Sequence, residues 1–283
     1  MVYRAENEKS VPNLLSKLTR IAKDRNTSFY PISSGYVEKG KDFGSSAYRL
    51  LSMPKVALVS SQEVSSQSAG QVWHFFEQEL DYPLTLISAQ SLNNLDIRKV
   101  NVLILPDGNY SDKIGEQLSG WLNSGGKLIL MEDAINAALG KRPFDIKKKE
   151  DPKKEEKPSS GKTYALRDKD DLSNSIPGAI YKVSLDRSHP LTLGLGQYYY
   201  TLKTDDKIYD FLSNGWNVGT LKENSYIAGI AGEKIKQRLN SGLLFGVQPV
   251  GRGTIIYLGT DVLFRSFWEN GKQLFINALF LVN

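Results

Sequence analysis

The sequence predicts an α/β domain built on a parallel sheet, with antiparallel strands added in its second half. Two observations carry this prediction. Between residues 54 and 139, short apolar runs alternate with helical segments, and the runs lack the alternation of a half-exposed strand. Past residue 175, period-two alternation and glycine-containing turns replace that pattern, as in antiparallel hairpins.

Residues 1–53 are expected to be a connecting segment. Behind Pro12, apolar residues recur at helical spacing, which predicts a helix over residues 12–23. Residues 29–32 predict a short strand, and residues 36–53 are typical of an irregular connector. Because so short a segment cannot hold a core alone, the folded domain is expected at residues 54–283.

The parallel half is predicted from four buried strands. They are Val56–Ser60, Leu84–Ser88, Val102–Pro106 and Lys127–Met131. Helices are expected over 69–80, over 111–122 with Ser111 or Asp112 as cap, and over 132–139. Strands joined through helices in this order indicate a parallel sheet covered on both faces.

The second half predicts shorter strands and a final helix. The strand candidates are Ala179–Leu185, Tyr198–Leu202, Trp216–Thr220, Tyr226–Ala231, Leu243–Val247 and Thr254–Leu258. The last two flank Gly251 to Gly253, a hairpin signature. An apolar helix is expected over residues 271–282.

Composition excludes several chemistries. The 283 residues include no Cys and two His, so thiolate chemistry, disulfides and a three-histidine metal site are ruled out. Aromatic residues make up 10% and charged residues 24%, which excludes a disordered chain. No apolar window is long enough to span a membrane, and no secretory signal follows Met1.

The basic charge is local. Residues 141–158 carry eight basic and five acidic residues, which accounts for three of the five net positive charges. A nucleic-acid surface would need basic residues spread over a folded face with stacking aromatics. We therefore expect a charged, mobile insertion at about 141–175 and no nucleic-acid partner.

Candidate ligand residues stand where the parallel strands end. In open α/β sheets, ligands bind at the carboxyl ends of the strands, so Asp107, Gly108, Asn109 and Glu132 are the binding candidates. Residues 60–68 are rich in hydroxyls, but they lack early glycines and contain Glu63. Capping of the next helix by Ser66 or Ser68 is therefore favoured over phosphate binding.

Two further patterns in the sequence allow both a functional and a structural interpretation. His74 and Glu77 fit an H-x-x-E zinc pattern with His189 as a distant third ligand. His74 lies among aromatic residues on a helix, so no metal site is expected here. Residues 198–200 with Trp216 could stack on sugars, although packing is the commoner role of such rings.

Residues 56–139 resemble the class I glutamine amidotransferase-like fold, a flavodoxin-like sandwich. The resemblance lies in residues 102–108, where that family has its oxyanion glycines, and in residues 121–131, which lead to its nucleophile elbow. The elbow cysteine falls on Glu132, and no His-x-Glu pair follows near residues 257–261. The amidotransferase reaction is thus excluded by chemistry. Residues 189–194 resemble a turn of the trehalose-utilisation-type branch.

A second resemblance covers most of the chain. Residues 33–44, 72–83, 176–182 and 263–271 resemble the carboxyl-terminal region of large bacterial zinc carboxypeptidases. The resemblance implies a peptidase domain upstream of Met1 that holds the zinc, with residues 1–53 as the connection to it. It also implies an extracytoplasmic parent protein that cleaves peptide carboxyl ends, and no cofactor in this chain.

The resulting expectation is a non-catalytic accessory domain, supporting the peptidase domain or binding a peptide or glycan. One alternative is a carbohydrate- or cell-wall-binding module. The other is an independent hydrolase that uses Glu132, Asp133, Asp261 or His189. That hydrolase would need the carboxylates to converge, with at least one raised pKa.

Overall fold

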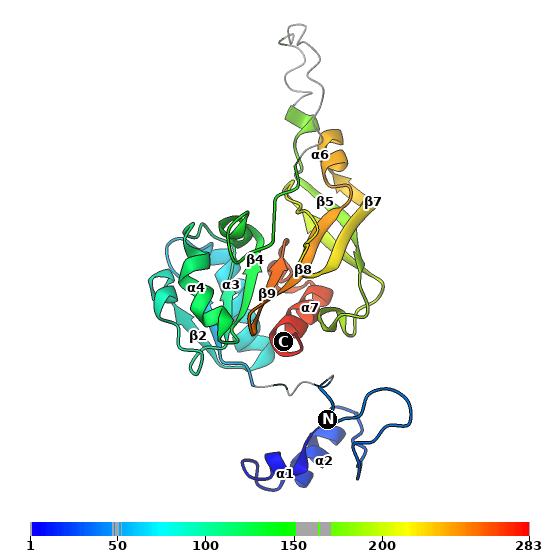
Figure 1. Ribbon diagram of the computed structural model, residues 1–283. Coiled ribbons are helices and arrows are strands. Elements are labelled where there is room, and N and C mark those ends of the chain that lie inside the picture. The colour runs from blue at the N-terminus through cyan, green and yellow to red at the C-terminus, as the bar shows by residue number, and fades with distance from the viewer. Residues whose placement is uncertain are drawn as a thin grey trace. The chain divides into compact units, whose positions relative to one another are not determined.

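The computed structural model describes residues 2–46, 48, 51, 53–150, 164 and 171–282. The chain divides into two compact units, Met1–Leu50 and Leu51–Asn283 (Figure 1). In the first unit, α1 (Arg4–Asn7) and α2 (Leu14–Asp24) are the helices among the described residues. The predicted strand at 29–32 is wrong, because these residues are irregular and exposed, and no strand among the described residues pairs with them.

The second unit contains one sheet of nine strands in the order β2-β1-β3-β4-β9-β8-β7-β5-β6. The strands are β1 (Val56–Val59), β2 (Leu84–Ile87), β3 (Val102–Leu105), β4 (Lys127–Met131), β5 (Gly178–Leu185), β6 (Tyr198–Lys203), β7 (Trp216–Ile230), β8 (Gly242–Val250) and β9 (Gly253–Leu258). The first five strands in this order pair in parallel, and every later pairing is antiparallel. This confirms the predicted parallel sheet with added antiparallel strands.

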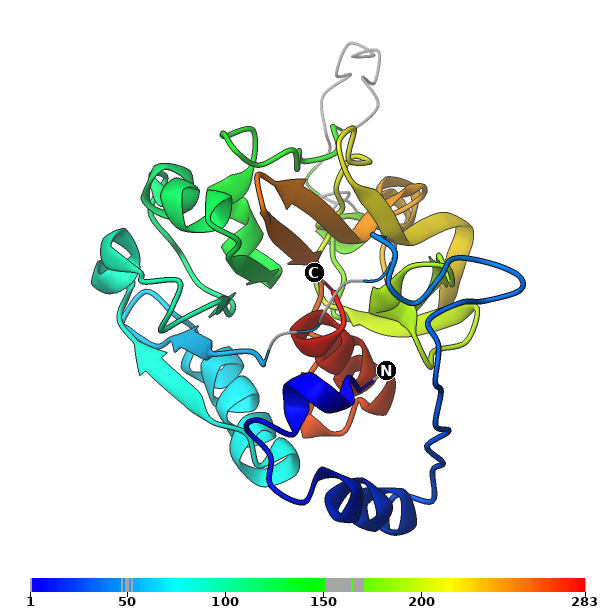
Figure 2. The same cartoon turned by 60° about the horizontal axis from the view of Figure 1, so that its bottom comes forward.

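Helices cover both faces of the sheet (Figure 2). They are α3 (Ser66–His74), α4 (Ile114–Asn123), α6 (Glu233–Arg238) and α7 (Glu269–Phe280), and the shorter turns are η1 (Phe75–Leu80), η2 (Ala89–Asn94), η3 (Glu132–Ala138), η5 (Pro190–Thr192) and η6 (Phe264–Ser266). Alternate residues of the parallel strands enter two separate cores, one shared with α3 and α7 and the other with α4 and η3. The strand order and the two covered faces are those of a flavodoxin-like sandwich.

Three local predictions differ from the structure. The two short strands at 216–231 are one strand, β7, with register shifts against both neighbours. Ser65, not Ser66 or Ser68, caps α3 by accepting a hydrogen bond from the Ser68 amide (3.4 Å). The predicted helix at 69–80 begins earlier, and its second half is the π-helix η1.

The charged segment is only partly described. Residues 151–163 and 165–170 lie outside the described residues, so the expected insertion at 141–175 is seen mainly at its ends. At its start, Phe144 and Ile146 are buried against α4 and η3. These two side chains belong to the core, because the apolar residues of a mostly charged stretch are the ones that gain by burial.

Among the described residues, no helix has the length and apolar character needed to cross a membrane.

Candidate functional site

Glu132 occupies a sharp strand-to-helix turn. β4 ends at Met131 in extended conformation, Glu132 follows with φ of 47°, and η3 begins at once. A left-handed conformation costs a residue other than glycine on the order of 1–2 kcal/mol. Such a turn raises the side chain above the sheet edge, as at the nucleophile elbows of α/β enzymes. The sequence resemblance placed the elbow at this residue, and the backbone has that form.

Three carboxyl groups stand at the ends of three neighbouring strands. Asp107 follows β3, Glu132 follows β4 and Asp261 follows β9, and these strands are adjacent and parallel. Burial, together with the charges of Asp261, Asp107 and Asp205, raises the pKa of Glu132 to about 8. Burial also raises the pKa of Asp107 and of Asp261. The convergence that the hydrolase alternative requires is therefore present for these three groups.

Asp107, Gly108 and Asn109 are held by the loop after β1. The Asp107 amide donates to the Ser68 hydroxyl (3.1 Å), and the Asn109 amide donates to the Glu63 carbonyl (2.8 Å). A Cβ at Gly108 would lie 2.7 Å from that same carbonyl, so only glycine fits. The hydroxyl-rich loop is thus packed against the turn after β3, and it anchors the Asp107 backbone.

Asp107 also organises the elbow. Its Oδ1 accepts a hydrogen bond from the Asp133 amide (3.1 Å), one residue past Glu132. The Gly108 amide lies close enough to the Asp107 carboxylate to lower its pKa, which partly opposes the effect of burial. Asp107 therefore links the turn after β3 to the elbow after β4.

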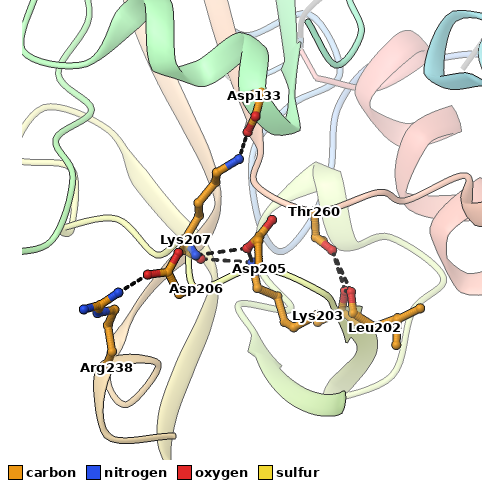
Figure 3. Close-up of polar contacts among 9 residues, drawn as sticks. Asp133, Leu202, Lys203, Asp205, Asp206, Lys207, Arg238 and Thr260 are labelled. Atoms are coloured by element: carbon orange, nitrogen blue, oxygen red, sulfur yellow. Dashed lines mark hydrogen bonds and ion pairs between the residues drawn. The ribbon is translucent and has the colours of Figure 1, made fainter. Parts of the chain in front are cut away.

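A segment that sequence reasoning missed supplies the cations. Because directions alternate from β9 through β8, β7 and β5 to β6, β6 runs parallel to β9 and ends at the same edge. Lys203 ends β6 with 1% of its surface exposed, and its ammonium contacts Asp205 (2.5 Å). Lys207 pairs with Asp133 across the site (Figure 3). No motif marks these residues, since the long antiparallel excursion alone brings them to the elbow.

Two buried tyrosines complete the site. Tyr199 and Tyr209 are fully or almost fully buried, and neither hydroxyl has a hydrogen-bond partner among the described residues. Burial raises the pKa of both hydroxyls. The charge of Asp261 adds to this effect at Tyr199, and the charges of Asp205 and Glu132 add to it at Tyr209. Buried polar groups in proteins are normally satisfied, so two orphaned hydroxyls beside one carboxyl cluster indicate a place where a ligand binds.

Asp261 is oriented by its own turn and by α3. Its Oδ1 accepts from the Leu263 amide (3.0 Å). With the Gln71 amide nitrogen facing the carboxylate, that nitrogen donates to Asp261 Oδ2 (3.1 Å), and the Gln71 oxygen accepts from the Arg265 amide (3.2 Å). Arg265 has φ of 48°, so this turn is strained too.

His189 does not join this site. Lys203 lies opposite Ala179 at one end of the β5–β6 pair, whereas His189 follows Leu185 at the other end. Its Nδ1 accepts from the Leu191 amide (3.1 Å), and its ring contacts Trp216, with centroids 5.6 Å apart. Burial lowers the pKa of His189. Its position makes it a capping residue of η5.

The H-x-x-E pair is a surface feature. His74 ends α3 and Glu77 lies in η1, and both side chains are exposed. Within the described residues, no three His, Cys, Asp or Glu side chains are placed to hold a metal ion together.

The exposed aromatic residues among 198–200 and 216 lie on two strands, β6 and β7, which β5 separates. Tyr198 and Tyr200 are exposed on β6 and Trp216 is exposed on β7, whereas Tyr199 is buried. Tyr198 lies opposite Ser184, which lies opposite Thr220. Trp216 is four residues from that position, or about 13 Å along the strand.

Comparisons with known proteins add resemblance of fold. No family model matches the chain, and no curated protein matches it. Solved structures that resemble it include a ThuA-like protein from Bacteroides uniformis (14% identity, 83% of this chain and 94% of the other, TM-score 0.47). Another ThuA-like protein, from Parabacteroides merdae, has 12% identity over 72% of this chain and 77% of its own, with a TM-score of 0.44.

A third is a glutamine amidotransferase from Thermotoga maritima (9% identity, 79% and 95% coverage, TM-score 0.43). With TM-scores below 0.5, these likenesses carry no argument about function. The α/β sandwich assignment rests on the strand order and the two covered faces of this chain.

Proposed function

We propose that this chain is a ligand-binding accessory domain of a larger peptidase-like protein. Its binding site is the cluster formed by Asp107, Glu132 and Asp261, which we call the acidic site. The observation that carries the proposal is the convergence of these three carboxyls, with raised pKa values, beside the unpartnered hydroxyls of Tyr199 and Tyr209.

The cost of these features to the stability of the fold supports the proposed binding role. Each of these features costs stability: a strained elbow, mutually repelling carboxyls and buried hydroxyls without partners. A domain with a purely mechanical role would gain by replacing them with apolar or paired groups. Their concentration at the edge where flavodoxin-like sheets bind ligands is typical of a functional site.

The binding role is preferred over amidotransfer because the nucleophile is missing. The elbow carries a carboxyl group that is largely protonated at neutral pH, and no histidine stands beside it within the described residues. The parent protein is proposed from the carboxypeptidase resemblance of residues 33–44, 72–83, 176–182 and 263–271. Zinc, proteolysis and an extracytoplasmic location belong to that parent.

The test is a binding screen on the full chain. Amines, neutral sugars and short peptides are assayed by thermal shift and calorimetry against the wild type and Glu132→Gln. Glu77→Gln is the matched control, because it makes the same chemical change on an exposed part of η1. Ligands that bind the wild type and the control but not Glu132→Gln support the proposal. A screen in which no binding depends on Glu132 contradicts it.

A second candidate function is an independent hydrolase, and one observation favours it. A protonated Glu132 beside Asp261 resembles the separated acid and base of carboxylate hydrolases, in which environment sets the two roles. Turnover of chromogenic glycosides and esters that is lost in both Glu132→Gln and Asp261→Asn would establish it. Turnover that persists in both variants would belong to a contaminant and exclude this candidate.

A further inference from the structure

The charges of the acidic site do not balance. Lys207 pairs with Asp133 and Lys203 pairs with Asp205 (Figure 3). Asp107, Glu132 and Asp261 form no ion pair within the described part of the chain. Asp107 and Asp261 accept hydrogen bonds from neutral amides, whereas the Glu132 side chain has no hydrogen bond to any described residue.

The nearby cations offset these charges only in part. Lys207 lowers the pKa of Asp107 and Lys203 lowers that of Glu132, yet both carboxyls keep raised pKa values because burial and the other carboxylates outweigh them. Three acidic groups at adjacent strand ends therefore lack a counterion. The arrangement favours a bound positive charge, which would stabilise all three at once.

The buried hydroxyls provide a second, independent indication. Tyr209 is 2% exposed, and burial together with the charges of Asp205 and Glu132 raises the pKa of its hydroxyl. A Cβ at Gly259 would lie 3.0 Å from the Tyr209 ring, so the ring lies against the turn between β9 and Asp261. A phenol oxygen can accept a hydrogen bond from an N–H donor, and no described residue supplies one.

We infer that the acidic site binds a ligand carrying a primary ammonium group, held by Asp107, Glu132 and Asp261 with a tyrosine hydroxyl as a further acceptor. The inference rests on the proposed binding function and adds the class of ligand. An anion would be repelled by the net negative charge, and a neutral sugar would leave that charge uncompensated.

Binding of a cation is linked to proton release. The charged and titratable groups that face Glu132 from the packed elements are Asp107 after β3, Asp133 in η3, Lys203 in β6, Asp205, Lys207 and Tyr209 after β6, and Asp261 after β9. With a pKa of about 8, Glu132 is mostly ionised at about pH 8.5 and mostly neutral at about pH 6.5. The cation should bind about 25-fold more tightly at the higher pH, from the ratio of the ionised fractions.

The experiment is calorimetry on the full chain with diaminobutane at millimolar concentration, near pH 8.5 and near pH 6.5. Butanediol is the neutral ligand of matched length, and Mg²⁺ is the metal comparison. We expect diaminobutane alone to bind, more tightly at the higher pH and with release of a proton at the lower pH. Glu132→Gln should weaken binding at the higher pH and remove most of its pH dependence, whereas Glu77→Gln should change neither.

The possible outcomes separate the ammonium inference from the proposed binding function. If butanediol or neutral sugars bind as tightly as the diamine and their binding requires Glu132, the ammonium inference is overturned and the binding function stands. Mg²⁺ binding in place of the diamine would overturn it in the same way. Diamine binding unchanged in Glu132→Gln, or no diamine binding at all near pH 8.5, would also overturn it. The wider screen described above then decides separately whether the acidic site binds anything.

Discussion

Replacing Glu132 by Gln should stabilise the protein at neutral pH. The folded chain holds the Glu132 proton up to a pKa of about 8, against an ordinary value of 4.5. Between these values the unfolded chain loses its proton first, so the wild type loses stability as pH rises through this window. Below pH 4.5 the Glu132 contribution is fully present, and above pH 8 it is fully lost.

The magnitude follows from the shift. Each pKa unit corresponds to about 1.4 kcal/mol, and roughly two and a half units separate 4.5 from pH 7. Glu132→Gln should therefore exceed the wild type in free energy of unfolding by about 3 kcal/mol at pH 7, and by almost nothing near pH 4.5. The amide keeps the size of the side chain and the conformation of the elbow, so packing should not change.

Urea denaturation followed by tryptophan fluorescence is the assay. All four tryptophans, at 73, 121, 216 and 268, lie in the Leu51–Asn283 unit, so the signal reports on that unit alone. Glu77→Gln is the control and should match the wild type at every pH. If the difference in unfolding free energy between Glu132→Gln and the wild type stays constant from pH 5 to pH 8.5, the pKa of Glu132 is not raised, since only titration of Glu132 makes that difference vary.

Three further predictions concern other positions. Lys127→Met should stabilise the protein by about 2 kcal/mol at pH 7, because burial lowers the pKa of Lys127 from 10.5 to about 8 and the variant loses only one hydrogen bond to α7. The unfolding free energy of the wild type should rise between pH 8 and 10, and urea titrations of the variant should lack that rise. Gly271→Ala should cost about 3 kcal/mol or more in chemical denaturation, since its Cβ would lie 1.8 Å from the Val262 carbonyl, while Gly120→Ala, with nothing within 4 Å, should stabilise by about 0.5–1 kcal/mol. Trp216→Ala should leave retention on immobilised glycans unchanged, and a loss of retention would instead support the carbohydrate-module alternative.

Local patterns predicted the parallel half of the fold closely. The four predicted strands are short apolar runs, which made them easy to locate. Every residue of β1, β3 and β4 is buried as expected, whereas β2 lies at the edge of the sheet and is partly exposed. β7 was harder, because Asn and Gly residues within it looked like a turn between two strands. The π-helical η1 was not expected either, since Phe75 and Phe76 have the same apolar spacing in an α-helix.

The acidic site was half predictable. Asp107, Glu132 and Asp261 follow apolar runs, so their place at a common edge could be inferred from the chain order of the strands. Lys203 and Lys207 could not, because they reach the site through antiparallel pairings whose register is set by distant residues. The sequence predicted Tyr199 only as a core residue or a stacking ring. The alternating burial along β6 shows that it is a core residue.

The binding site and its ligand both depend on the buried carboxyl group of Glu132 at the elbow. The most direct test is an NMR titration of carboxyl carbons in the full chain, with the Glu132 resonance assigned by its absence in Glu132→Gln. We expect a midpoint near 8 for this carboxyl group, lowered when diaminobutane is added. A midpoint near the ordinary value of 4.5, unchanged by the diamine, would contradict both the site and its ligand.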